Sequence, residues 1–198
     1  MDIKIFFAIF SVAAGMAAFL PYLKDIFSRK TKPHAYTWFI WAITQGTATM
    51  GIYYGKGGWG GLELAIGTCF VIIIFLFSLK YGTKNMTKSD TFILIVALAA
   101  ILFWWQLNQP VLSILMVLII DVLGYIPSFR KSYQNPWEET LVSWFLFGLS
   151  DIFSIFALSE YNILTMAYLT VIAFLNFCLF LLCLLRIYAI TVSKNHSV

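Results

Sequence analysis

Four polar side chains fall deep within long apolar segments of this chain, and they are its clearest candidates for chemistry. They are Gln45, Asp121, Asp151 and Asn176. A charged side chain at the centre of a bilayer costs about 2.5–3.5 kcal/mol even on the most lenient scale, so it usually faces a cavity and has a function. Carboxyl and amide groups in such a place can bind a polar or cationic solute, and a carboxyl group can also carry a proton. We therefore expect these four residues to bind substrate.

Aromatic residues accompany two of these polar groups at helical spacing. Each set recurs at intervals of three and four residues, which places its members on one face of a helix. The sets are Trp38, Trp41 and Gln45, and Trp144, Phe147 and Asp151. Such a stripe can line a path and stack on a planar ligand or on the face of a sugar. The alternative is packing, because aromatic and amide side chains at this spacing also join neighbouring helices.

The composition places these residues in a membrane protein. The chain of 198 residues is 61% hydrophobic and only 11% charged, whereas about a quarter of a soluble domain is charged. Crossing the hydrocarbon core takes roughly 17–25 helical residues, and spans surrounded by lipid must satisfy their own backbone hydrogen bonds as helices. We expect seven spans, near residues 4–23, 35–54, 59–79, 91–107, 110–129, 139–159 and 163–187.

An internal repeat relates the two ends of the chain at a constant offset of 106 positions. Residues 18–45 align without gaps on residues 124–151, and this register places Gln45 on Asp151. Duplicated membrane proteins of this kind are typical of transporters with a substrate site between the halves. We expect one membrane domain, 1–198, made of a three-helix repeat at 1–82, a linker helix at 89–108 and a second repeat at 110–190. The single linker helix makes the two repeats parallel.

The basic residues predict the orientation of the chain in the membrane. Of the 13 Lys and Arg residues, all but Lys4 and Lys56 fall on the side of the first, third, fifth and last loops. By the positive-inside rule this side is cytoplasmic and the N-terminus is outside. The eleven residues are Lys24, Arg29, Lys30, Lys32, Lys80, Lys84, Lys88, Arg130, Lys131, Arg186 and Lys194. A plasma membrane, by default the bacterial inner membrane, is the expected location.

The two repeats resemble the SWEET and PQ-loop (MtN3-like) transporter superfamily. The resemblance is carried by "FLPYLKDIFSRKT…TWFIW" and "GYIPSFRKSYQN…SWFLFGLSD", in which a proline, a basic loop and an aromatic-rich helix follow one another. Tyr22 and Ser128 stand where the family motif has Gln. The resemblance implies seven helices in a 3+1+3 arrangement and alternating-access transport of a sugar or similar neutral metabolite. It also implies that Pro21 and Pro127 are hinges, although a helix stop at the membrane edge is the alternative.

Other functions stay open beside sugar transport. A proton-coupled amino acid carrier or a cationic-solute carrier would use the aspartates, which have no basic residue at their depth. A vitamin-precursor channel of the PnuC type would share the helix plan. A non-transporting receptor or sorting protein on the same scaffold would instead need a basic pocket for a peptide carboxylate. The expected partners are a small-molecule solute, the lipid bilayer and protons, and a homo-oligomer stays open.

Several classes are not expected from the sequence. An enzyme would need a nucleophile with a base, or carboxylates beside a metal, but no His falls within a span and the two histidines, His34 and His196, are far apart. We expect neither a cofactor nor a metal site. The net charge of +4 comes from the topogenic loops, so a nucleic-acid partner is not expected. Glu63 is expected to reach water at the outer end of its helix and to pair with Lys56.

Overall fold

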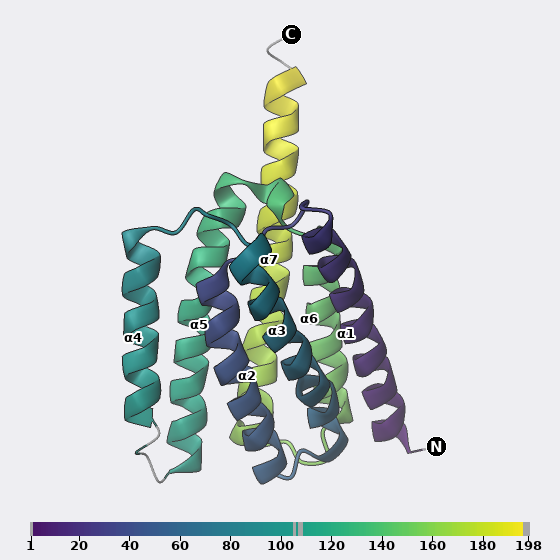
Figure 1. The fold of residues 1–198 in the computed structure, drawn as a ribbon. Coiled ribbons are helices and arrows are strands. Elements are labelled where there is room, and N and C mark those ends of the chain that lie inside the picture. Colours follow the sequence, from purple (N-terminus) through teal and green to yellow (C-terminus); the bar gives the residue numbers. More distant parts are fainter. Residues whose placement is uncertain (1, 105, 107–108, 196–198) are drawn as a thin grey trace.

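The chain folds into helices joined by short turns (Figure 1). The structure, a computed structural model, describes residues 2–104, 106 and 109–195, and that part contains no β-strand. The prediction of an all-helical fold is confirmed. The α-helices are α1 (Ile3–Phe27), α2 (Ala35–Tyr54), α3 (Leu62–Tyr81), α4 (Lys88–Trp104), α5 (Pro110–Gln134), α6 (Leu141–Ala157) and α7 (Ile163–Asn195), with short 3-10 helices at η1 (Gly58–Gly61) and η2 (Pro136–Glu138).

The helix boundaries differ from the expected spans mainly on the side that carries the basic loops. There, α1, α5 and α7 run several residues further than expected. Each added part contains basic or other polar residues that lower its hydropathy, so hydropathy alone places the ends too early. Residues 105 and 107 of the expected span 91–107, residue 108 of the linker and His196 lie outside the described residues.

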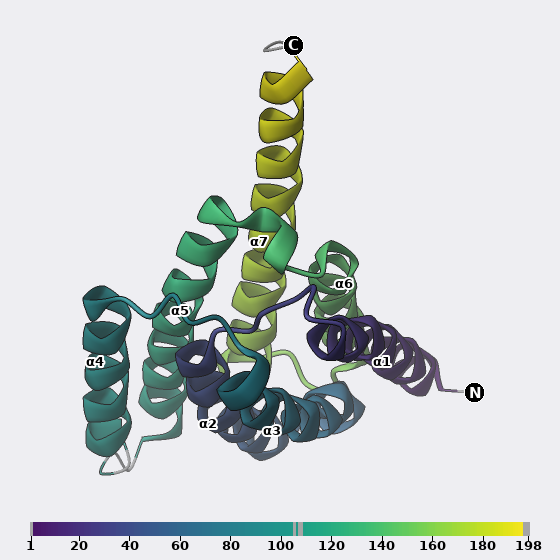
Figure 2. The ribbon, with the colours of Figure 1, turned by 45° about the horizontal axis from the view of Figure 1, so that its top comes forward.

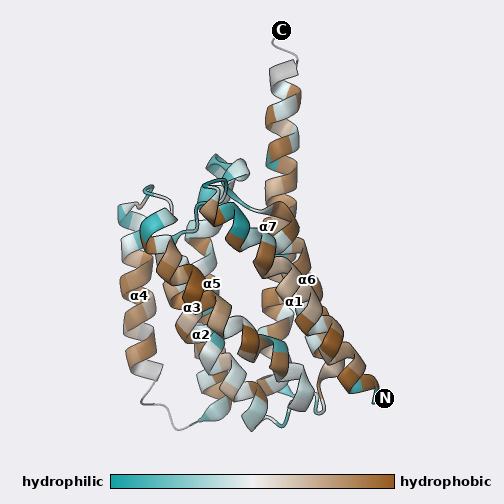
Figure 3. Cartoon of the chain, turned by 45° about the vertical axis from the view of Figure 1, so that its right-hand side comes forward, coloured by the Kyte–Doolittle hydropathy of each residue, from teal (hydrophilic) through white to brown (hydrophobic). Residues whose placement is uncertain are grey.

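Among the described residues, four segments are long and apolar enough to cross a membrane: Ile3–Phe27, Gly58–Tyr81, Pro110–Gln134 and Ile163–Ser193. At 17 residues each, α4 and α6 are shorter. The 20 residues of α2 include several Thr and Gly residues, which lower its hydropathy. Apolar residues cover the bodies of the helices, while hydrophilic residues gather on the loops near the emerging end of α7 (Figure 3). These features make the chain a membrane protein, with large side chains such as Leu76 and Phe174 exposed on its outside.

The packing order of the helices is the same in the first three and the last three. Of the described residues, those of α3 contact both α1 and α2, which do not contact each other. Likewise α7 contacts both α5 and α6, which do not contact each other. The two sets meet where α1 packs on α6 and α2 packs on α5. Seen from the end of the molecule, α4 lies at the edge beside α5 (Figure 2).

Hydrogen bonds between the two sets repeat at the offset found in the sequence. The Thr37 hydroxyl in α2 donates to the backbone oxygen of Gly124 in α5, at 2.9 Å. The aligned residues are Ser143 and Ala18, and the Ser143 hydroxyl donates to the Ala18 oxygen at 2.8 Å. The first helix of each set is therefore bonded to the second helix of the other by the same kind of contact.

The two aligned prolines lie inside helices. Beyond Pro21, α1 continues to Phe27, and beyond Pro127, α5 continues to Gln134. The alternative of a helix stop at each proline is therefore wrong. Because proline has no N–H group, each helix lacks one backbone hydrogen bond one turn earlier, and such a site bends more easily than the rest of a helix.

Candidate functional site

A cavity of about 50 Å³ lies between the two sets of helices. All eight residues singled out in the sequence line it, although they come from four helices. They are Trp38, Trp41 and Gln45 of α2, Asp121 of α5, Trp144, Phe147 and Asp151 of α6, and Asn176 of α7. The helical spacing that places each trio on one face therefore brings both faces to the same cavity.

Asp121 is held by donors from two other helices. Its Oδ1 atom accepts a short hydrogen bond from the Thr44 hydroxyl of α2 and one at 3.0 Å from the Tyr168 hydroxyl of α7. The indole Nε1 of Trp41 approaches the Asp121 backbone oxygen at 3.4 Å. The carboxyl group therefore joins both sets of helices without any charged partner.

Asp151 ends a chain of hydrogen bonds that crosses the cavity wall. The Tyr125 hydroxyl donates to Asn176 Oδ1 at 2.8 Å, and Asn176 Nδ2 donates to Asp151 Oδ2 at 2.9 Å. The residues aligned with Tyr125 and Asn176 are Phe19 and Phe70, which stack with ring centroids 4.9 Å apart. The aligned contacts therefore differ in kind: Tyr125 and Asn176 form a hydrogen bond, whereas Phe19 and Phe70 form an apolar ring contact.

Glu63 is a third carboxyl group at this cavity, and the sequence-based expectation for it is wrong. Its side chain is buried with 7% of the residue exposed, it lines the cavity, and no ion pair joins it to Lys56 in the described part of the chain. Gly15 of α1 leaves room for it, since a Cβ atom there would lie 2.6 Å from Glu63 Oε1. Gly15 is the residue aligned with Asp121. The first set of helices therefore has no carboxyl group at the position of Asp121 and supplies one from Glu63 of α3 instead.

Three tryptophan rings lie next to one another in the lining of the cavity. Trp41 lies 5.2 Å from Trp38 and 6.0 Å from Trp144, measured between ring centroids. Tyr22 packs against both Trp38 and Trp144. The aligned residues Trp38 and Trp144 therefore both contact the Tyr22 ring. This ring has no aromatic counterpart in the second set of helices, because Ser128 is aligned with Tyr22.

Three further aromatic residues line the cavity, and none of them is among the residues predicted from the sequence. Phe19, Tyr125 and Tyr168 contribute rings to the cavity, and the two tyrosines also contribute hydroxyl groups. The alignment does pair Phe19 with Tyr125, which was the available signal for these two. Nothing in the spacing of Tyr168 distinguishes it from a packing residue.

The ionisable lining residues of the cavity include acids and no bases. Its described lining holds the carboxyl groups of Glu63, Asp121 and Asp151 and no Lys, Arg or His side chain. With amide groups from Gln45 and Asn176, it offers acceptors, a few donors and aromatic faces. A volume of about 50 Å³ holds only a few water molecules. A solute can occupy this site only if the two sets of helices move apart.

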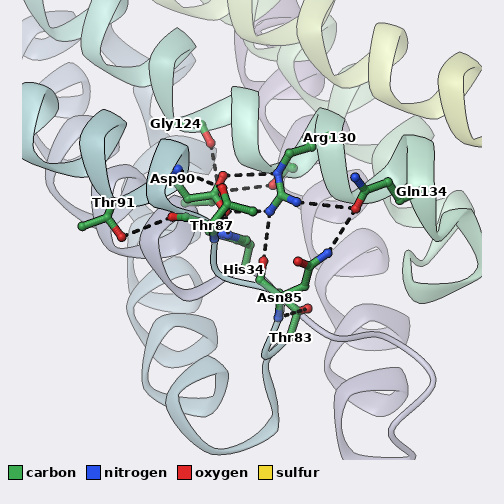
Figure 4. A network of polar contacts seen from close by, with 11 residues as sticks. His34, Thr83, Asn85, Thr87, Asp90, Thr91, Gly124, Arg130 and Gln134 are labelled. Atoms are coloured by element: carbon green, nitrogen blue, oxygen red, sulfur yellow. Dashed lines mark hydrogen bonds and ion pairs between the residues drawn. The ribbon is translucent and has the colours of Figure 1, made fainter.

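A second polar cluster lies where α4 meets α5, on the side of the basic loops (Figure 4). Arg130 donates from Nε and Nη2 to the Asp90 carboxylate, at 3.3 and 2.6 Å. The same Nη2 donates to the Asn85 backbone oxygen at 2.9 Å. The cluster ties the α3–α4 loop to α5, and its charges are paired.

His34 adds a neutral imidazole to this cluster. Its Nε2 atom lies 3.4 Å from Asp90 Oδ2, a contact that favours the protonated ring. Burial has the larger effect and lowers the pKa of His34 from 6.5 to about 4, and the charges of Lys131 and Arg130 act in the same direction. Because burial lowers its pKa to about 4, His34 is uncharged at neutral pH.

Contacts join the two sets of helices on both sides of the cavity. On the basic side, Lys32 Nζ lies 2.5 Å from Glu138 Oε1, and the Thr31 and Thr140 hydroxyls are 2.5 Å apart. Lys32 and Glu138 are aligned residues of the two repeats. On the opposite side, Asn162 Nδ2 donates to the Gly55 oxygen at 2.9 Å.

Comparisons with known proteins add no relative to this description. No protein-family model matches the chain, and neither a curated protein nor a solved structure shows a significant match.

Proposed function

We propose that the protein is a membrane carrier that moves a small polar solute by alternating access. The observation that carries this proposal is the cavity between the two sets of helices, to which both sets contribute polar and aromatic side chains. A site at the meeting point of two repeats can be exposed to either side in turn when one repeat moves against the other. The helices α1–α3 and α5–α7 would be these moving parts, with α4 as linker in a 3+1+3 plan.

The packing supports two parallel repeats. Each third helix lies between the other two of its set, and the hydrogen bonds of Thr37 and Ser143 are equivalent at the offset of 106. In this arrangement the loops near the emerging end of α7 are cytoplasmic and the N-terminus is outside. The membrane would be a plasma membrane, as the basic loops predict.

Pro21 and Pro127 are the proposed hinges of the movement. Each lies in the first helix of its set, about two turns before that helix ends at Phe27 or Gln134. A missing backbone hydrogen bond at these positions makes bending less costly there than elsewhere in the same helix. Bending at both sites would open the cytoplasmic side, where Lys32 and Glu138 now join the two sets.

The family resemblance favours a sugar or similar neutral metabolite as the solute. A cationic solute, or proton coupling, is the second candidate, and the observation that favours it is the lining of three carboxyl groups without a basic residue. The tryptophan faces add to this, because aromatic rings attract cations. A receptor for a peptide carboxylate would be expected to have a basic pocket, and this cavity is acidic.

The test is counterflow in proteoliposomes with sugars, amino acids, amines and nucleosides, with and without a pH gradient. Uptake of at least one solute is expected, and Asp151→Asn should reduce it about tenfold or more because the lining charge is lost. Glu160→Gln is the matched control, since Glu160 is an exposed acid outside the cavity. Uptake that is insensitive to Asp151→Asn would show that the cavity is not the path. If no solute moves, the receptor becomes the better proposal.

A further inference from the structure

A second hollow, of about 410 Å³, opens on the side of the basic loops. We call it the basic hollow. It lies between the α1–α2 loop, the end of α3, the α3–α4 loop and the segment around η2. The residues that matter for its chemistry are Arg29, Lys32, Lys80, Tyr81, Lys84 and Glu138. Its volume is within the range of roughly 300–1,000 Å³ typical of small-molecule sites.

The charge of the basic hollow is not balanced by its own residues. Lys32 is paired with Glu138, but in the described part of the chain Arg29, Lys80 and Lys84 form no ion pair. The C-terminal ends of α1, α3 and α5 lie at this region, and each contributes about half a negative charge. An excess of about 1.5 positive charges remains after the three helix ends are counted.

The positive-inside rule explains the side on which these residues lie but not why they share one hollow. Other basic residues of the same side are used differently. Arg130 and Lys131 are paired with Asp90 and Glu139, while Lys30 is exposed and does not line the hollow. The rule therefore does not explain why Arg29, Lys80 and Lys84, which form no ion pair, line the same hollow.

Arg29 occupies a backbone conformation that arginine adopts rarely. Its φ is 59°, and it directly follows the α1 cap at Ser28, where glycine is the commonest residue. The turn is closed by the Lys30 and Thr31 N–H groups, which donate to the Asp25 oxygen. A left-handed residue with a side chain costs about 1–2 kcal/mol. Despite this cost, Arg29 occupies the position, and its side chain lines the basic hollow.

We propose that the basic hollow binds a phosphate-bearing anion. Arginine binds phosphate oxygens through paired N–H donors, and lysine contributes a point charge. Arg29, Lys80 and Lys84 supply both kinds of group around a space of suitable size. The phosphate can belong to a soluble compound or to the headgroup of an anionic lipid, because the hollow lies near the expected membrane surface.

Lys32 connects this site to the contact between the two repeats. An anion in the basic hollow competes with Glu138 for the Lys32 ammonium group, which now lies 2.5 Å from the carboxylate. Removing the carboxylate should therefore strengthen anion binding, whereas removing Arg29 should weaken it. Two substitutions in one hollow thus have opposite expected effects.

The test measures binding of inorganic pyrophosphate by calorimetry to the full chain in nanodiscs of zwitterionic lipid. In parallel, the melting temperature is measured in nanodiscs with and without phosphatidylglycerol. Arg29→Gln should weaken whichever ligand binds by about tenfold, and Glu138→Gln should strengthen it by a few fold. Lys30→Gln is the matched control, because it removes the same charge from the next residue without touching the hollow. Lys84→Gln is a second test variant that leaves the Arg29 turn intact.

Each result favours a soluble phosphate ligand, favours a lipid headgroup, or contradicts binding in the basic hollow. Pyrophosphate binding that Arg29→Gln and Lys84→Gln reduce, and Lys30→Gln does not, supports a soluble phosphate ligand. Stabilisation by phosphatidylglycerol alone, with the same pattern among the variants, supports a lipid headgroup. Equal effects of Arg29→Gln and Lys30→Gln would mean general surface attraction, and that result, like no binding of either probe, overturns the proposal.

Discussion

Buried carboxyl groups occur in two regions of this protein, and their surroundings are opposite. On the side of the basic loops, Asp90 is paired with Arg130 and Glu139 with Lys131. In the central cavity, Glu63, Asp121 and Asp151 have no basic neighbour among the lining residues. The first region has the charge balance of a structural contact. The second has carboxyl groups that no basic residue of the lining compensates, and such groups can bind a solute or carry a proton.

The contrast follows from the cost of burying charge. A buried ion in a protein costs several kcal/mol unless a partner and hydrogen bonds compensate for it. Lys131 obtains this compensation in full, since its Nζ atom also donates to the backbone oxygens of Lys32 and Glu138. Asp151 obtains only a hydrogen bond from the Asn176 amide. The same substitution, carboxyl to amide, should therefore have different consequences in the two regions.

Glu139→Gln should have the largest effect on stability. Lys131 and Glu139 have side chains that are 0% and 2% exposed, so removing one charge leaves the other buried without a partner. The free energy of unfolding should fall by about 3–5 kcal/mol. Unfolding in mixed detergent micelles, followed by circular dichroism, measures this change.

The neighbouring pair provides the control for that experiment. The side chains of Lys32 and Glu138 are 43% and 23% exposed, and pairs in contact with water contribute at most about 1 kcal/mol. Glu138→Gln should therefore change stability by no more than that. Equal losses for the two variants would show that burial does not distinguish these pairs.

Stability should also fall as His34 becomes protonated. Burial lowers the pKa of His34 to about 4 in the folded protein, below its ordinary value of 6.5, so the fold favours the neutral ring. The stabilisation is complete above pH 6.5 and is lost as the pH falls from 6.5 to about 4, by at most about 3 kcal/mol. His34→Gln should flatten this part of a stability–pH profile. A profile with the same slope in the variant would assign the loss to other groups.

Neutral contacts between the repeats form an intermediate case. Thr37→Val and Ser143→Ala each remove one donor to a backbone oxygen in the other set of helices. Each should cost about 1 kcal/mol of unfolding free energy. Because the two bonds lie at aligned positions in the repeats, the losses should be similar, and they should add in the double variant. Strong coupling between them would mean that the two contacts break as one unit.

The sequence predicts which helix faces line the cavity better than it predicts the partners of the charged residues around it. Hydropathy and helical spacing determine which residues share an inward face, and these patterns brought Gln45 and Asp151 to one cavity. The sequence predicts that Glu63 reaches water at the outer end of its helix and pairs with Lys56. Its true position depends on the space at Gly15, which is distant in the sequence. Lys131 was interpreted as a topogenic loop residue for the same reason, because its partner is visible only in three dimensions.

Asp121→Asn should have the smallest effect on stability, and the direction of that effect is informative. Asparagine keeps an oxygen that can accept the hydrogen bonds from Thr44 and Tyr168, while the ionisable carboxyl group is removed. The free energy of unfolding should stay within about 1 kcal/mol of the original value or rise slightly. The micelle assay used for Glu139→Gln measures it, with Asp151→Asn alongside. A loss as large as that of Glu139→Gln would show that Asp121 has a compensating charge in the folded state. The central carboxyl groups would then resemble the structural ion pairs on the side of the basic loops, and this result would contradict the proposal that the cavity is the binding site.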